Sequence, residues 1–264
     1  MKPSALPDYA NWIPKKIVAG PGFAAALLTL LFALSFLLPG GTLSLILRVV
    51  LGAAVLLVLA LFFYMAHARV LLSYEGGGVQ GKILDNVLRY LDWDGFGELL
   101  DIGCGSGALT IRAAKKFPDA QCVGMDYWGA MWDYAQAQCE KNARLEGVAG
   151  RVRFRKGDAA RLDFPDAAFD AAVSNFVFHE VRTQPDKLAL IREALRVLKP
   201  GAPFAFEDVF FSKRHYPDLE GMVKALSGEV TELRFVNTRK NDFVPKFLCT
   251  PLVAGEMGLI CEKK

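Results

Sequence analysis

Two long apolar runs occupy the first quarter of the chain. Residues 17–38 carry no charged side chain, and at roughly 1.5 Å per residue a helix of this length crosses a ~30 Å hydrocarbon core. Residues 43–65 form a second run whose single charge, Arg48, lies near its start, where the side chain can reach the membrane interface. The intervening Pro39-Gly40-Gly41 indicates a turn. The pattern therefore predicts a hairpin of two transmembrane helices.

Two other interpretations fit parts of this pattern. A cleaved signal peptide has an apolar stretch of only about 7–15 residues and is not followed directly by a second one. A buried hairpin of a soluble protein would need a partner surface that covers helices apolar on all sides. Basic side chains precede the first run and follow the second: Lys15, Lys16, His67 and Arg69. The positive-inside rule then predicts a multi-pass membrane protein with both termini and the larger domain in the cytoplasm.

The composition changes abruptly after the second run. The Gly-rich stretch 73–78 indicates a boundary, so we expect a membrane anchor over residues 1–75 and a second domain over residues 76–264. The formal net charge of +3 lies within the anchor, and the rest of the chain is formally neutral, which argues against a nucleic-acid partner. Five cysteines show no spacing typical of a disulfide scaffold or a zinc site, and we expect no metal.

Helix-like and strand-like segments alternate along the larger domain. An amphipathic helix is predicted over residues 79–91, and the segments after it are strands at 98–102, 121–126, 151–156, 169–175 and 203–209 and helices at 107–117, 129–145 and 185–198. This alternation is typical of an α/β fold whose mostly parallel sheet is covered on both faces. Two consecutive strands, 230–236 and 252–262, predict an antiparallel edge at the C-terminus.

A Gly-rich turn follows the first strand of this domain. The segment L-L-D-I-G-C-G-S-G, residues 99–107, predicts a buried strand that turns into a helix through glycines, which allow backbone to approach a ligand closely. Gly103, Gly105 and Ala108 also satisfy the dinucleotide-binding pattern, so a nicotinamide-dependent oxidoreductase is an alternative. Asp101 favours a different ligand, because its carboxylate would attract a cationic amine and repel a pyrophosphate.

Acidic residues end the next two strands. Asp126 lies where a carboxylate can accept hydrogen bonds from both hydroxyls of a ribose, although a solvated acid at a strand end fits the same position. Asp158 could accept from an adenine amino group, or it could form a turn or cap a helix. Tyr127 or Trp128 could lie against the adenine or belong to the ordinary packing.

Five motifs in this order resemble the class I S-adenosylmethionine-dependent methyltransferases, particularly those of ubiquinone and menaquinone biosynthesis. The resemblance covers roughly residues 80–264 and includes F-D-A-A-V-S-N at 169–175 and A-L-R-V-L-K-P-G at 194–201. It implies a Rossmann-like seven-stranded, mostly parallel sheet with an antiparallel C-terminal hairpin, and S-adenosylmethionine as cofactor. It also implies cofactor contacts from the loop residues Gly103, Cys104, Gly105 and Gly107, from Asp126 at the ribose, from Asp158 and Ala159 at the adenine, and from Asn175 near the methionine end.

The acceptor side is less specified by the sequence. His179 follows the strand that ends at Asn175 and could remove a proton from an oxygen or sulfur acceptor, or it could only shape the pocket. His215 and Tyr216 could line the entrance, and an apolar entrance is expected from Phe176, Val177, Phe178, Phe210 and Phe211. We therefore expect a membrane-anchored methyltransferase for a small, lipophilic acceptor. A membrane-tethered, non-catalytic cofactor-binding or scaffold protein is the alternative.

Overall fold

The computed structural model describes residues 6–74, 78–129, 135–251 and 253–264. The chain forms two compact units. One comprises Asn11–Gln80, and the other combines Met1–Ala10 with Gly81–Lys264. The expected boundary between residues 75 and 76 lies outside the described residues, as does most of the first turn of the helix expected from residue 129.

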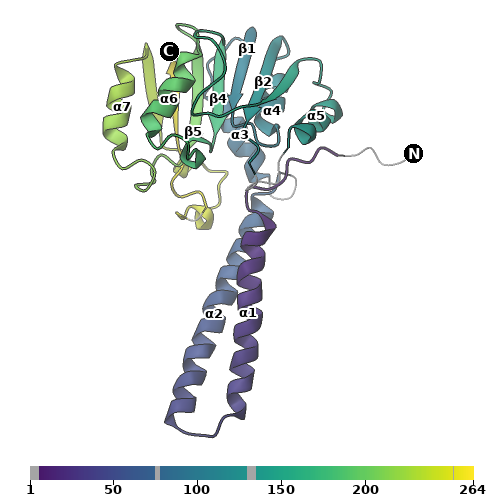
Figure 1. The fold of residues 1–264 in the computed structure, drawn as a ribbon, viewed down its shortest axis with the longest axis vertical. Helices are drawn as coiled ribbons and strands as arrows, with labels where there is room; N and C mark the ends of the chain where they lie inside the picture. The colour runs from purple at the N-terminus through teal and green to yellow at the C-terminus, as the bar shows by residue number, and fades with distance from the viewer. Residues whose placement is uncertain (1–5, 75–77, 130–134, 252) are drawn as a thin grey trace, which may run out of the picture. The chain divides into compact units, whose positions relative to one another are not determined.

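The smaller unit is a helical hairpin. Helix α1 (Lys15–Leu34) continues into a short 3₁₀ turn, η1 (Ser35–Leu37), and α2 (Thr42–Leu71) returns beside it (Figure 1). Both helices are long and apolar enough to cross a membrane, and most of their side chains are exposed. The second helix extends six residues beyond the predicted end. The prediction ended where the apolar run ends, at residue 65, but the more polar residues that follow continue the helix.

Arg48 closes the turn of this hairpin. Its guanidinium donates to the carbonyl oxygens of Ser35 and Leu38, each at 3.2 Å, and lies over the ring of Phe36. Both carbonyls lie at the C-terminal end of the first helical segment, where the regular helical hydrogen bonds end, and the Ser35 carbonyl also accepts from the Leu38 amide at 3.3 Å. The single charge in the second apolar run therefore satisfies backbone acceptors at the tip of the hairpin.

The larger unit contains a seven-stranded sheet. Its order is β3-β2-β1-β4-β5-β7-β6, in which β7 pairs antiparallel with both of its neighbours and all other pairs are parallel. The strands are β1 (Gly97–Ile102), β2 (Ala120–Asp126), β3 (Val152–Lys156), β4 (Ala171–Asn175), β5 (Pro203–Asp208), β6 (Glu232–Val236) and β7 (Gly258–Lys263). The Rossmann-like sheet with an antiparallel C-terminal hairpin is confirmed.

The helices of this unit match the predicted alternation with one addition. They are α3 (Val79–Arg89), α4 (Ala108–Lys116), α5 (Gln136–Leu145), α6 (Lys187–Arg196) and α7 (Leu219–Ser227), with short 3₁₀ turns η2 (Phe178–Glu180), η3 (Thr238–Lys240) and η4 (Lys246–Leu248). Helix α7 was not predicted, because it is short and contains Gly221. Its one clear start signal is Asp218, whose carboxylate accepts from the Gly221 amide at 2.9 Å.

The last strand is shorter than predicted. It begins at Gly258 rather than at residue 252, and turns precede it among the described residues. A Cβ on Gly255 would lie 2.6 Å from the carbonyl carbon of Thr250, so the chain folds tightly back on itself there. The apolar character of this stretch therefore reflects packing of a turn as well as of a strand.

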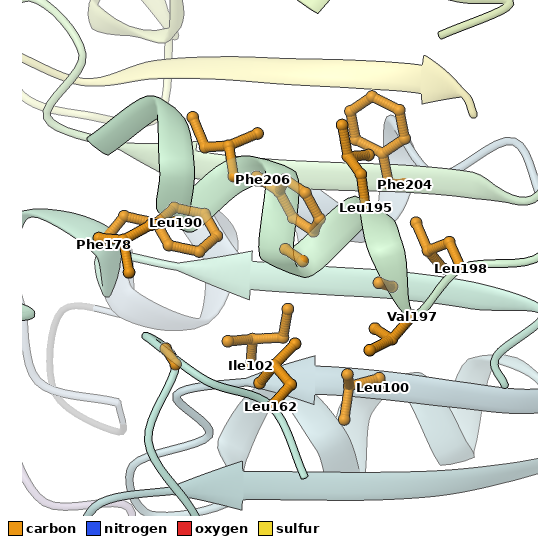
Figure 2. Packing of buried hydrophobic residues seen from close by; sticks show 14 of the residues in the cluster. Leu100, Ile102, Leu162, Phe178, Leu190, Leu195, Val197, Leu198, Phe204 and Phe206 are labelled. Carbon is orange, nitrogen blue, oxygen red and sulfur yellow. The ribbon is translucent and has the colours of Figure 1, made fainter. Parts of the chain in front are cut away.

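Alternate side chains of β1 face different helices, as strand geometry requires. Leu100 and Ile102 pack with Leu190 and Leu195 of α6 in one buried cluster, to which β5 contributes Phe204 and Phe206 (Figure 2). Asp101, between the two β1 residues, instead contacts α4. Helices thus cover both faces of the sheet, and the carboxyl ends of β1, β2, β4 and β5 meet along one edge.

Candidate active site

The loop between β1 and α4 contains three glycines, which allow a ligand to approach its backbone closely. Gly103, Gly105 and Gly107 all have positive φ, at 74°, 55° and 81°, a region that favours glycine. A Cβ on Gly103 would lie 2.1 Å from a methyl carbon of Val177, and one on Gly107 would lie 2.9 Å from the ring of Phe154. Side chains at these positions are therefore excluded by space as well as by conformation.

Asp126 at the end of β2 holds this loop in place. One carboxylate oxygen accepts from the Gly105 amide at 2.8 Å, and the other accepts from the Trp128 amide at 2.7 Å. A carboxylate offers about four lone-pair positions, so Asp126 can still accept from a ligand hydroxyl. The side chain is half-buried, at the place where the sequence predicts a ribose contact.

The two aromatic residues after Asp126 lie differently. The indole nitrogen of Trp128 donates to the Gly105 carbonyl at 2.8 Å, so this ring lies against the glycine loop. Tyr127 is 62% exposed, and the Nζ atom of Lys156 lies 5.4 Å from its ring centre. The expected contact of Tyr127 with a ligand stays a prediction, and Trp128 is the aromatic residue that the structure brings to the loop.

Two buried acceptor atoms near the carboxyl ends of β1 and β4 lack a hydrogen-bond partner among the described residues. They are Oδ1 of Asp101 and Oδ1 of Asn175. The other carboxylate oxygen of Asp101 accepts from the Thr110 hydroxyl at 2.5 Å. Burial raises the pKa of Asp101 to about 7 because the ionised form loses its hydration. A cationic amine is the kind of donor that the Asp101 carboxylate was expected to attract from its place in the motif.

Asp158 forms a local turn in addition to any ligand contact. Its Oδ1 accepts from the Ala160 amide at 2.9 Å and from the Thr183 hydroxyl at 3.2 Å. Ala159 is buried and belongs to the main apolar cluster. The turn-forming role considered for Asp158 is thus present. The contacts of Asp158 and Ala159 with an adenine stay predictions.

His179 and Asp208 form a polar pair with several hydrogen bonds. Asp208 ends β5 and is fully buried; its carboxylate binds Nδ1 of His179, which lies in η2 after β4. The same carboxylate accepts from the backbone amide of His179 at 3.0 Å, from the Tyr216 hydroxyl at 2.8 Å and from the Val209 amide at 2.7 Å. The orientation of the imidazole is therefore fixed, with Nε2 left for other partners.

The surroundings of His179 make its ring a strong base. Burial by itself would lower the pKa of His179, but the Asp208 carboxylate and Glu180 raise it to about 10. Glu180 Oε1 lies 3.5 Å from Nε2, and the ring of His215 lies 5.5 Å from that of His179. Asp208 stays ionised because His179 and Tyr216 outweigh the effect of burial and lower its pKa. The pair can therefore hold or accept a proton beside the end of β4.

Asp208 was missed by the sequence reasoning. It stands in the segment F-E-D-V at the end of a predicted strand, and an acid at a strand end is the same signal that singled out Asp126. Tyr216, expected at the entrance, is instead buried and bound to Asp208, whereas His215 is half-buried beside His179. Among the expected entrance residues, Phe178 and Phe210 are core residues, and Phe176, Val177 and Phe211 are half-buried.

Glu207 adds a second buried acid next to this pair. It is the sheet partner of Asn175 across the β4–β5 pairing, and neither carboxylate oxygen has a partner among the described residues. Burial raises its pKa to about 8, so at neutral pH it is mainly protonated and can donate a hydrogen bond. The ends of β4 and β5 thus hold one unpartnered amide oxygen and one neutral acid.

Comparison with known proteins places this unit among the methyltransferases. Residues 99–201 match the methyltransferase domain family. The arsenite methyltransferase of Aquipseudomonas alcaligenes is 36% identical over 153 residues, 56% of this chain and 40% of the relative. The demethylmenaquinone methyltransferase of Lactiplantibacillus plantarum is 37% identical over 105 residues, 39% of this chain and 41% of the relative. The chain thus spans less than half the length of these relatives.

Solved structures share the fold. The geranyl diphosphate C-methyltransferase of Streptomyces coelicolor, in complex with Mg²⁺, geranyl diphosphate and S-adenosyl-L-homocysteine, superposes with a TM-score of 0.54 at 17% identity, covering 72% of this chain and 80% of that one. The [4+2]-cyclase SpnF gives a TM-score of 0.51 at 24% identity, covering 69% and 79%. At these identities the likeness shows the fold alone, and the cyclase shows that this fold is not tied to one reaction.

Fold, motif order and family match together define an S-adenosylmethionine-dependent methyltransferase domain of class I. Its relatives include demethylmenaquinone and ubiquinone/menaquinone C-methyltransferases as well as arsenite and sterol methyltransferases. The family match excludes the nicotinamide-dependent alternative, which shared only the glycine pattern.

The residues present fit S-adenosylmethionine. The loop with glycine at 103, 105 and 107 can offer its backbone to the ligand, and Asp126 can offer acceptor oxygens to the ribose. The unpartnered oxygens of Asp101 and Asn175 suit the ammonium group of its methionine part. These are the parts of the cofactor that the sequence analysis assigned to these residues, and the contacts themselves stay predictions.

Proposed function

We propose that this protein transfers the methyl group of S-adenosylmethionine to a small, lipophilic acceptor at a membrane. The observation that carries the catalytic part is the fixed His179–Asp208 pair at the carboxyl ends of β4 and β5, next to the end of the strand that carries Asn175. The membrane and acceptor parts are supported by the apolar hairpin. They are also supported by the names of relatives, which include a demethylmenaquinone and a sterol 24-C-methyltransferase.

The cofactor supplies an activated methyl group with its own leaving group, so the protein has to align the acceptor and exclude water. The half-buried Phe176, Val177 and Phe211 offer apolar surface near the ends of β4 and β5. For an oxygen or sulfur acceptor that carries a proton, His179 takes that proton at Nε2 while Asp208 holds Nδ1. For an acceptor without such a proton, the pair only shapes the site.

The direct test is transfer of a labelled methyl group. Purified full-length protein, S-adenosylmethionine with a labelled methyl group and a lipid extract of membranes are incubated, and labelled products are identified by mass spectrometry. We expect label in an apolar small molecule and an equal amount of S-adenosylhomocysteine. Binding of the cofactor without any labelled product would instead support the non-catalytic scaffold.

The hairpin is proposed to span the membrane, with both of its ends in the cytoplasm. We expect the full-length protein to stay in the membrane pellet after extraction with alkaline carbonate. Arginine at the exposed positions Leu30 and Leu57 should release much of it, because a charge near a helix centre costs about 2.5–3.5 kcal/mol on insertion. Full release of the unmodified chain by carbonate would contradict a spanning hairpin.

Cofactor affinity is expected to rise with pH around neutrality. Asp101 attracts an ammonium group only when ionised, and its pKa is raised to about 7 by burial. The carboxylate form therefore predominates above this pH and disappears below it, so affinity for S-adenosylhomocysteine should increase from pH 6 to pH 8. Calorimetry across this range measures the change. An Asp101→Asn variant should bind more weakly and lose this dependence, and an equal dependence in the variant would exclude Asp101 as its origin.

A further inference from the structure

The segment that precedes the first helix packs onto the methyltransferase domain. We name residues 6–10 the N-terminal strap. The backbone amide of Asp8 donates to Oδ1 of Asn142 at 2.9 Å, and the Asp8 carbonyl accepts from the side-chain amides of Asn142 and Gln138 at 2.7 and 2.6 Å. The Tyr9 hydroxyl donates to Glu146 at 3.0 Å. The strap is thus bound to α5 and to Glu146, the residue after this helix. These partners follow the strap by more than a hundred residues in the sequence.

The strap also contacts the glycine loop. The hydroxyl of Ser106, a loop residue, donates to the Tyr9 carbonyl at 2.9 Å. Asn142 donates to the Ser106 carbonyl at 3.1 Å, so one side chain of α5 binds both the strap and the loop. Tyr9 is only 3% exposed, and Ser106 and Asn142 are buried, so these bonds lie out of water.

This contact has a consequence for the cofactor. A loop with three glycines in the left-handed region has little conformational preference of its own, and its shape depends on what holds it. Asp126 holds Gly105 from the side of β2, whereas the strap holds Ser106 through Tyr9. The two contacts fall on adjacent residues, Gly105 and Ser106, within the loop that we expect to present its backbone to the ligand.

We propose that the N-terminal strap is a positioning element of the cofactor site, which sets affinity for S-adenosylmethionine without touching it. The strap leads to α1 through only four residues, 11–14, so the membrane helix tethers the element that holds the loop. This inference rests on the cofactor assignment. Residues 6–10 thereby act on the cofactor site through the glycine loop.

The test uses the protein in lipid nanodiscs. In one variant residues 2–9 are deleted, which removes all of the strap except residue 10, and in a second variant Tyr9→Ala disrupts it. We expect the Kd for S-adenosylhomocysteine and the KM for S-adenosylmethionine to rise about tenfold on deletion, the loss of roughly two net hydrogen bonds. kcat at saturating cofactor should stay within about twofold, because the strap does not touch the acceptor. Leu6→Ala is the matched control, since Leu6 is 70% exposed in the same segment.

A second measurement separates positioning from general destabilisation. Ser106→Ala removes the hydroxyl that joins loop and strap, so its effect on Kd should be strongly reduced once the strap is deleted. Additive effects of the two changes, or an unchanged Kd in the deletion variant, would overturn the proposal. If no form of the protein, including the unmodified one, binds S-adenosylhomocysteine, the cofactor assignment itself is wrong.

Discussion

Replacing His179 with glutamine is expected to lower kcat by about 10²–10⁴-fold for an acceptor that loses a proton on methylation. Glutamine retains hydrogen-bonding capacity but cannot accept a proton, so only the proton-transfer role is removed. Affinity for S-adenosylhomocysteine should stay within about twofold, because we propose that His179, in η2 after β4, acts on the acceptor and not on the cofactor. Steady-state kinetics with the acceptor identified by labelling, together with calorimetry, measure both quantities.

The pH dependence of the same reaction distinguishes a base from a residue that only shapes the pocket. With the pKa of His179 raised to about 10 by Asp208 and Glu180, the neutral ring that can accept a proton grows in population as pH rises, so kcat should increase up to about that pH. Asp208→Asn should move this increase to lower pH and reduce its plateau. Glu229→Gln, which breaks a surface ion pair with Arg192, serves as the control. A kcat that does not change in His179→Gln would remove the base from the mechanism.

Replacing Asp126 with alanine is expected to weaken cofactor binding by about 10- to 100-fold, the usual range for charge-assisted hydrogen bonds. Two losses combine in this variant. The ribose hydroxyls lose their acceptor, and the Gly105 and Trp128 amides lose the carboxylate that braces the loop. Calorimetric titration with S-adenosylhomocysteine measures the effect.

Asp126→Asn and Asp163→Ala complete this series. The asparagine keeps one acceptor oxygen, so the affinity of this variant for S-adenosylhomocysteine should lie between those of the alanine variant and the unmodified protein. Asp163 is an exposed acid that forms a surface ion pair with Arg155, so its replacement should leave Kd unchanged. Equal affinity of a folded Asp126→Ala variant and the unmodified protein would exclude the ribose assignment.

The positions of the proposed cofactor residues in the fold were predictable because they follow from local sequence. In a strand–turn–helix unit such residues lie within a few positions of a strand end, so L-L-D-I-G-C-G-S-G and Asp126 could be placed at strand ends from the pattern, and Asn175 from the family resemblance. Parallel pairing then brings these strand ends to one edge, which required no knowledge of side-chain contacts. The same reasoning could have found Asp208, which ends β5.

The rest of the site depends on contacts that sequence spacing does not encode. His179 and Asp208 are 29 positions apart, and Asp8 and Asn142 are 134 apart, so neither pairing leaves a periodic signal. The pKa of His179 follows from the buried carboxylate beside it, not from the residue type. Helix α7 was missed because it is short and contains a glycine, so its apolar residues form no clear helical pattern. The packing of Met222 and Leu226 against the rest of the domain stabilises this helix.

The ends of the hairpin unit meet each other. Asn11 and Ser73 form an antiparallel bridge, and the side-chain amide of Asn11 donates to the Arg69 carbonyl at 2.8 Å. In sequence, the hairpin unit is therefore an insertion between the two pieces of a discontinuous domain, and the ends of the insertion are joined by hydrogen bonds. This geometry suggests how to remove the hairpin. Joining residue 11 to residue 73 through a short turn would delete both apolar helices and keep the N-terminal strap. Truncation at the end of the second helix would remove the strap as well.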